Sequence, residues 1–139
     1  MAKSQIETPK ESVESLLEKA NRGYTTMPKF GSPSPDFNFE ILGQIFCALG
    51  ADKKVNERTR SAIHGMAAIA PQNEIEGMLA AQMVGAHYTA MQCLARAALK
   101  KITVAEYGEN LAGAAALMQA YAALMDALSR YRNVSKEVS

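Results

Sequence analysis

The residues with the clearest capacity for chemistry are Met83, His87 and Met91, which recur at every fourth position. Residues at this spacing lie on one side of an α-helix, so an imidazole and two thioethers would form a column. Such ligands suit copper(I) or haem iron. The same column also fits a protein core, where methionine fills irregular space and a histidine needs one hydrogen-bond partner. We favour the core interpretation and expect no cofactor and no metal; a metal or haem site around His87 is the third alternative for function.

Other patterns typical of enzymes are missing from the sequence. It contains no HExxH or CxxC motif, and no glycine-rich phosphate loop follows a predicted strand. Cys47 and Cys93 both occur in apolar helical patterns, which predicts two buried, reduced thiols. The first twelve residues lack the apolar stretch of a signal peptide. We therefore expect a non-catalytic, cytoplasmic protein.

A basic cluster is the strongest argument for nucleic-acid binding. Lys53, Lys54, Arg58 and Arg60 fall on one predicted helix, and an oligomer would multiply the cluster. Asp52 and Glu57 lie among these residues, however, and the net charge of the whole chain is only +1. A solvated helix face explains the cluster equally well. DNA contact is therefore an alternative function and not the favoured one.

The elements that must position all these residues are helices. Alanine, leucine, methionine, glutamate and lysine dominate, and no segment has the alternation of a strand. Proline and capping residues divide the chain into predicted helices over 9–21, 37–49, 53–69, 72–101 and 104–132. The predicted fold is all-α, with the last two helices forming a long antiparallel hairpin on which the shorter helices pack. We expect a short helix and a Pro/Gly/Ser-rich linker over 1–36, a bundle over 37–133 and a disordered tail over 134–139.

The last predicted helix has two apolar faces. Large residues form one face, which we expect to pack on the preceding helix: Leu111, Leu117, Met118, Tyr121, Leu124, Met125 and Leu128. Small residues at alternating spacings of three and four form the other, named here the alanine face: Gly113, Ala116, Ala120, Ala123 and Ala127. The alanine face permits close approach of another helix, so we expect it to bind a second copy and complete the bundle by oligomerisation.

Two further features of the long helices leave alternatives open. Leu111–Leu128 spans 18 residues, close to the length of a membrane span, but Asp126 lies inside it and favours burial by protein over a membrane. On the preceding helix, a polar stripe consists of Gln82, Thr89, Gln92 and Arg96. This stripe is either a solvated face or a polar track inside the oligomer.

Part of the sequence resembles a group of bacterial proteins. The run Glu74–Met83, followed by His87, Met91 and Arg96, is similar to small uncharacterised all-helical proteins often found among prophage or mobile-element genes, as is Tyr121–Leu128. The resemblance covers about residues 71–132 and implies a cytoplasmic accessory protein without transferring any residue's role. Together with the two apolar faces, it favours a homo-oligomeric assembly or interaction protein.

Overall fold

The computed structural model describes residues 30–50 and 55–138, and in these ranges all regular structure is helical. The helices are α2 (Pro35–Ala48), α3 (Val55–Ile69), α4 (Glu74–Ala97) and α5 (Val104–Val138). The predicted all-α class is thereby confirmed. The predicted helix over 9–21, and the basic residues Lys53 and Lys54, lie outside the described residues.

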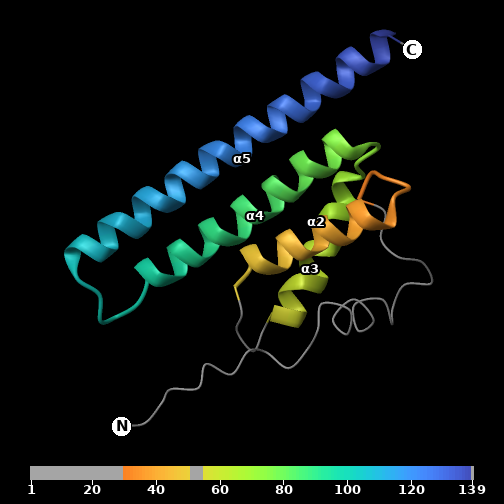
Figure 1. Cartoon of the computed structure of the whole chain (residues 1–139). Helices are drawn as coiled ribbons and strands as arrows, with labels where there is room; N and C mark the ends of the chain where they lie inside the picture. Colours follow the sequence, from red (N-terminus) through yellow and green to blue (C-terminus); the bar gives the residue numbers. More distant parts are fainter. Residues whose placement is uncertain (1–29, 51–54, 139) are drawn as a thin grey trace.

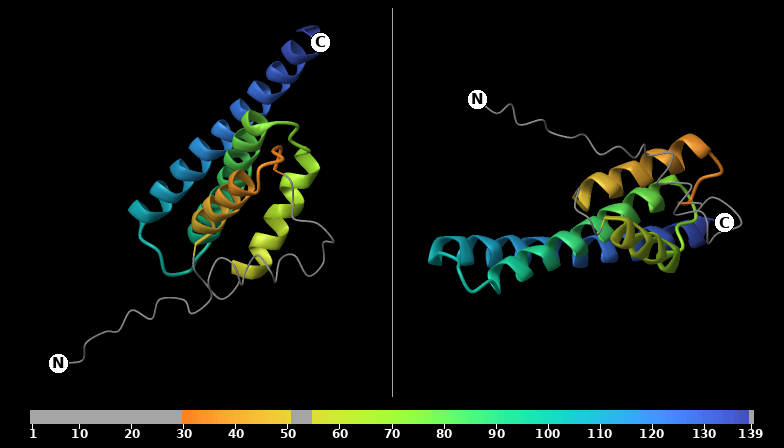
Figure 2. Two further views of the ribbon diagram at one scale, coloured as in Figure 1. Left: turned by 45° about the vertical axis from the view of Figure 1, so that its right-hand side comes forward. Right: turned by 90° about the horizontal axis from the view of Figure 1, so that it is seen from below.

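Helix α4 occupies the centre of the arrangement. It runs side by side with α5 in the opposite direction, and α2 and α3 lie on its other side (Figures 1 and 2). We call the end of the α4–α5 pair near Glu74 and Arg132 the proximal end, and the end at residues 97–104 the distal end. Helices α2 and α3 cover the proximal part of α4, whereas, of the described helices, only α4 and α5 form the distal end.

The core is built mainly from α2, α3 and α4. Its buried residues are Phe30, Ile41, Leu42, Ile45, Leu49, Ala62, Ile63, Met66, Ala80 and Val84. Burying such aliphatic side chains contributes on the order of 1.5–3 kcal/mol each. Helix α5 contributes only Ala114 and Leu128 as fully buried residues along its whole length. The main core therefore does not explain why α5 is so apolar.

The segment before α2 belongs to the bundle and is not a surface linker. Phe30 and Ser32 are both buried, and Asn38 holds them in place. The Asn38 amide accepts a hydrogen bond from the Phe30 N–H at 3.0 Å and donates one to the Ser32 carbonyl at 3.0 Å. Because one side chain satisfies both loop groups, this segment can be buried. Residues 30–34, the described part of the predicted linker that precedes α2, therefore pack on the bundle.

Both long helices end at positions other than those predicted. Helix α4 stops at Ala97 and not at 101, since residues 98–103 form the turn before α5. There, the Thr103 hydroxyl accepts from the Glu106 N–H at 3.1 Å, and the Glu106 carboxylate accepts from the Thr103 N–H at 3.0 Å. Helix α5 continues to Val138, so residues 134–138 of the predicted disordered tail are helical, while Ser139 lies outside the described residues. No glycine or proline follows residue 132 to stop the helix.

Candidate interaction surface

Arg132 fixes the position of α5 at the proximal end. Its Nε and Nη2 atoms donate to the two oxygens of Glu76 at 3.1 and 3.0 Å, and Nη2 also donates to the Ile69 carbonyl at 2.7 Å. Glu76 is only 3% exposed. Burial raises the pKa of the Glu76 carboxyl, but hydrogen bonds from Arg132 and the Gln72 N–H, together with the Arg132 charge, hold this pKa below its ordinary value. Arg132 thus ties α5 to both α4 and the end of α3.

A second polar contact supports the same junction. Asn73 caps α4 by accepting from the Glu76 N–H at 3.0 Å. The same side chain donates from its Nδ2 atom to the Tyr131 hydroxyl at 3.1 Å. Residues 73 and 76 therefore bind 131 and 132, which sets the register of the two helices. The sequence pattern does not predict this cluster, because no local spacing pairs residues that lie 56 to 58 positions apart.

The side of α5 that faces α4 is narrower than predicted. Residues spaced by three and four along α5 are buried or half-buried against α4: Ala114, Leu117, Tyr121, Leu124 and Leu128. Three large residues predicted to share this face instead lie outside, with Leu111 38%, Met118 55% and Met125 54% exposed. A single neighbouring helix covers only one seam of its partner, so a face this broad exceeds what α4 can bury.

The alanine face is largely exposed along α5. Ala116, Ala120 and Ala123 are exposed, while Gly113 and Ala127 are half-buried at its margin. Ala120 lines an open groove of about 500 Å³ between α2, α4 and α5, named here the α2–α5 groove. Gly85 and Ala86 of α4 line it as well, beside larger side chains such as Met78 and Leu117.

The predicted polar stripe of α4 is divided by the structure. Gln82 and Thr89 line the α2–α5 groove, next to the alanine face. Gln92 donates from its Nε2 atom to the Leu49 carbonyl at 3.4 Å, at the end of α2, and Arg96 is exposed further along. The stripe is therefore no single continuous track within one chain.

His87 is exposed, and so the expected core histidine is wrong. Its ring meets the Tyr88 ring edge to face, with the centroids 5.4 Å apart, and lies 6.3 Å from the Tyr121 ring. Met83 is buried, whereas Met91 is 51% exposed. The three residues of the column therefore do not share one environment. Within residues 30–50 and 55–138, no group of three His, Cys, Asp or Glu side chains could hold a metal ion.

His87 lines a second open groove, of about 750 Å³, between α3, α4 and α5. We name it the α3–α5 groove. It lies on the opposite side of α4 from the α2–α5 groove, as the residues of α4 that line each one show. Helix α5 is thus flanked by a groove on both sides.

The remaining candidate residues are dispersed. Arg60 is exposed and Arg58 is half-buried on α3. Cys47 is exposed, which contradicts its predicted burial, and Cys93 is half-buried against Gly113. Cys47 comes two residues after the buried Ile45, so it lies on a different side of α2. No other described helix covers that side. These residues form no site with the features above.

Helix α5 combines an apolar composition with exposure. It is long and apolar enough to cross a membrane, judged by length and composition alone, with a mean hydropathy of 1.4 over its most apolar 18 residues. Only 11% of that window is buried inside the protein. Comparison of the chain with known protein families, with curated proteins and with solved structures found no match.

Proposed function

We propose that the protein is a non-catalytic assembly protein that associates with copies of itself through α5. The exposure of this apolar helix is the observation that carries the proposal. Soluble proteins rarely expose a continuous apolar surface of this length unless a partner covers it. A second copy is an available partner in every solution of the protein.

The alanine face supports a particular arrangement of the two copies. Its spacing is nearly symmetric about Ala120, so two α5 helices running in opposite directions would place Gly113 opposite Ala127, with Ala116 and Ala123 within one residue of facing each other. A two-fold axis produces such self-matching contacts. Small side chains would then let the helix axes approach closely and gain extensive van der Waals contact.

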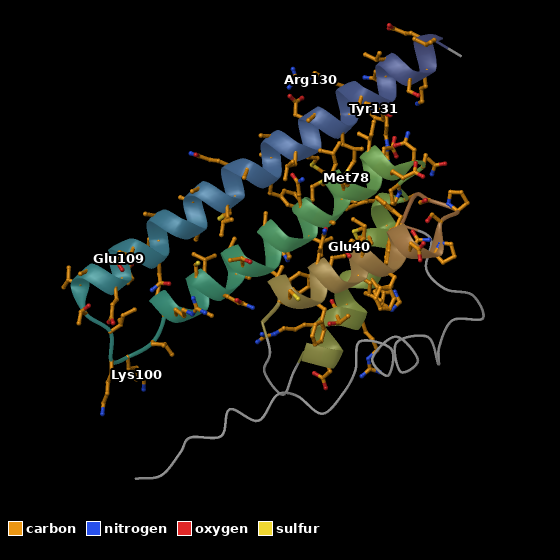
Figure 3. The ribbon with its side chains drawn as sticks, viewed as in Figure 1. Glu40, Met78, Lys100, Glu109, Arg130 and Tyr131 are labelled. Atoms are coloured by element: carbon orange, nitrogen blue, oxygen red, sulfur yellow. The ribbon has the colours of Figure 1, made fainter. Side chains whose placement is uncertain are left out.

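The charges on α5 favour the same antiparallel orientation. Glu109 and Arg130 lie toward opposite ends of α5 (Figure 3). Pairing about Ala120 brings position 109 of one helix beside positions 130 and 131 of the other, so opposite charges meet at both ends. A parallel pair would instead align Glu109 with Glu109 and Arg130 with Arg130, and like charges repel.

The mass of the protein in solution tests self-association. We expect light scattering to give at least twice the 15.0 kDa of one chain. Ala120→Leu should reduce the mass to that of a monomer, because the added bulk prevents close approach. Ala115→Leu is the matched control: Ala115 is exposed on the same helix but lies off the alanine face, and its variant should keep the assembly. A 15.0 kDa mass for the unaltered protein at all concentrations refutes the proposal.

The orientation can be tested separately by reversing charges. Glu109→Arg alone and Arg130→Glu alone should each weaken association by about tenfold, since two exposed ion pairs become repulsive contacts. The double variant should recover most of the affinity. Failure of this recovery would exclude the antiparallel pairing while leaving self-association intact.

Membrane association is a second candidate, which the hydropathy and exposure of α5 favour. Asp126 and Arg130 form an ion pair of 2.7 Å on the exposed side of α5, and a bilayer would have to accommodate both groups. Flotation with anionic lipid vesicles distinguishes the candidates. If α5 binds membranes, the Ala120→Leu variant should float with vesicles at least as well as the unaltered protein. If α5 is instead an assembly interface, neither protein should float with vesicles.

A further inference from the structure

Two thioethers and an imidazole border the α3–α5 groove where α4 and α5 meet. Met83 and His87 lie one turn apart on α4, and Met125 lies on α5. Met83 is 1% exposed and forms part of the floor of the groove, whereas Met125 is 54% exposed at its rim. Met91, the third member of the predicted column, does not line this groove. The fold thus supplies the second methionine from another helix.

The register of the two helices places Met125 opposite Met83. The rings of His87 and Tyr121 lie 6.3 Å apart across the α4–α5 pair. Because the helices are antiparallel, four residues toward the proximal end lead from His87 to Met83 and from Tyr121 to Met125. Residues four apart lie on the same side of a helix. Positions 83 and 125 therefore come opposite each other, one turn from the two rings.

These donors select a soft ion. Thioether sulfur favours copper(I), and imidazole also binds copper. No aspartate or glutamate lines this groove among the described residues, so it lacks the carboxylates that calcium and magnesium prefer. The methionine side chain has three rotatable bonds, which lets the sulfur of an exposed Met125 turn toward an ion held by its neighbours.

The imidazole is held in position from α3. The Tyr88 ring meets the His87 ring edge to face, with 5.4 Å between the centroids and 82° between the planes. The Tyr88 hydroxyl in turn donates to the Ser61 Oγ atom of α3 at 2.5 Å. Both Tyr88 and Ser61 line the groove. A ring restrained in this way loses less freedom when it binds a ligand, which favours affinity.

We propose that Met83, His87 and Met125 together bind one copper(I) ion in the α3–α5 groove. Each of the three supplies one neutral donor atom, so the ligands suit a monovalent ion. The alanine face lies toward the other groove, which Ala120 lines. Copper binding therefore does not depend on self-association of the chain.

Methyl NMR of the full-length protein, labelled at methionine, tests the site because copper(I) is diamagnetic. Thiols also bind this ion, so the anaerobic titration uses protein that carries Cys47→Ser and Cys93→Ser. We expect the Met83 and Met125 signals to shift together until one ion is bound per chain. The Met78 signal should stay in place, since Met78 is 45% exposed but lines the α2–α5 groove. In the unaltered protein, the same two signals should shift once the thiols are saturated.

Competition with a chromophoric copper(I) chelator measures the affinity of variants. His87→Ala and Met125→Leu each remove one ligand and should weaken binding at least about tenfold, because even the loss of a group that only orients a ligand costs about 10–100-fold. His64→Ala and Met78→Leu are the matched controls. Both residues are exposed but do not line the α3–α5 groove, so their variants should keep the affinity.

Three results would overturn the proposal. Met83 and Met125 signals that stay in place while the chain binds copper(I) would place the ion at other residues. Affinity that survives both His87→Ala and Met125→Leu would show that these side chains are not ligands. A loss of affinity in Ala120→Leu would make the site dependent on a second copy and not on one chain.

Discussion

The two ends of the α4–α5 pair differ in what surrounds them. At the proximal end, Phe30, Glu76 and Arg132 join four segments of the chain through buried contacts. At the distal end, α4 and α5 are the only described helices that meet, and Met91, Leu99 and Tyr107 are 51%, 59% and 47% exposed. Buried contacts among the described residues are thus concentrated at the proximal end, whereas large apolar side chains remain exposed at the distal end.

The largest expected contrast comes from removing one aliphatic side chain at each end. Ile45→Ala, where Ile45 is 2% exposed, should lower the free energy of unfolding by about 3–4 kcal/mol through lost burial and a cavity. Leu99→Ala at the distal end should lower it by less than about 0.5 kcal/mol. Urea denaturation measures both. Equal losses would mean that the distal end is as well packed as the proximal one.

The next effect concerns the Glu76–Arg132 pair. Glu76→Ala should cost about 2–3 kcal/mol, somewhat less than a fully buried pair, because the Arg132 side chain is 35% exposed. Asp126→Ala is the control, since the side chains of Asp126 and Arg130 are 65% and 74% exposed. Its cost should be under about 0.5 kcal/mol. Thermal denaturation of both variants compares a buried with a solvated ion pair on one helix.

The smallest effect is a dependence of stability on pH. Because folding lowers the pKa of Glu76, its ionised form stabilises the protein fully above the unfolded pKa, whose ordinary value is 4.5. This contribution is lost as the pH falls from 4.5 through the lower folded pKa. Glu76→Gln should therefore be less stable than the unaltered protein at pH 7, and the difference should shrink toward pH 3. If the stability difference between the two proteins stays constant with pH, Glu76 contributes through its packing and not through its charge.

Local signals in the sequence predicted the helices well and their contacts less well. Pro71 separates α3 from α4, and Thr103 and Glu106 begin α5, because each acts on neighbouring backbone groups. The large face of α5 was only partly right, since periodicity shows which residues share a side but not how much of that side a neighbour covers. Met118 and Leu117 are adjacent in the sequence, yet only Leu117 lies against α4 and the α2–α5 groove.

The candidate surfaces depend on how the helices pack against one another, which no local sequence pattern predicts. The alanine face was visible from spacing, and three of its five residues are exposed, but its role as an interface stays a prediction. The α3–α5 groove was not visible, because it brings Ala68, His87 and Lys136 together from three helices. His87 is exposed in a groove lined by α3, α4 and α5, an environment that the periodicity of α4 alone does not predict.

The contacts of Arg132 have a consequence for the kinetics of folding. They join residues 56 to 63 positions apart, whereas Cys93 and Gly113, near the distal turn, are only 20 apart in the sequence. Closing a short loop costs less chain entropy, so we expect α4 and α5 to associate first near their turn and to close last at Arg132. The end that contributes least to stability would then form first. Weakening the Arg132 contacts should accordingly accelerate unfolding and leave the folding rate almost unchanged.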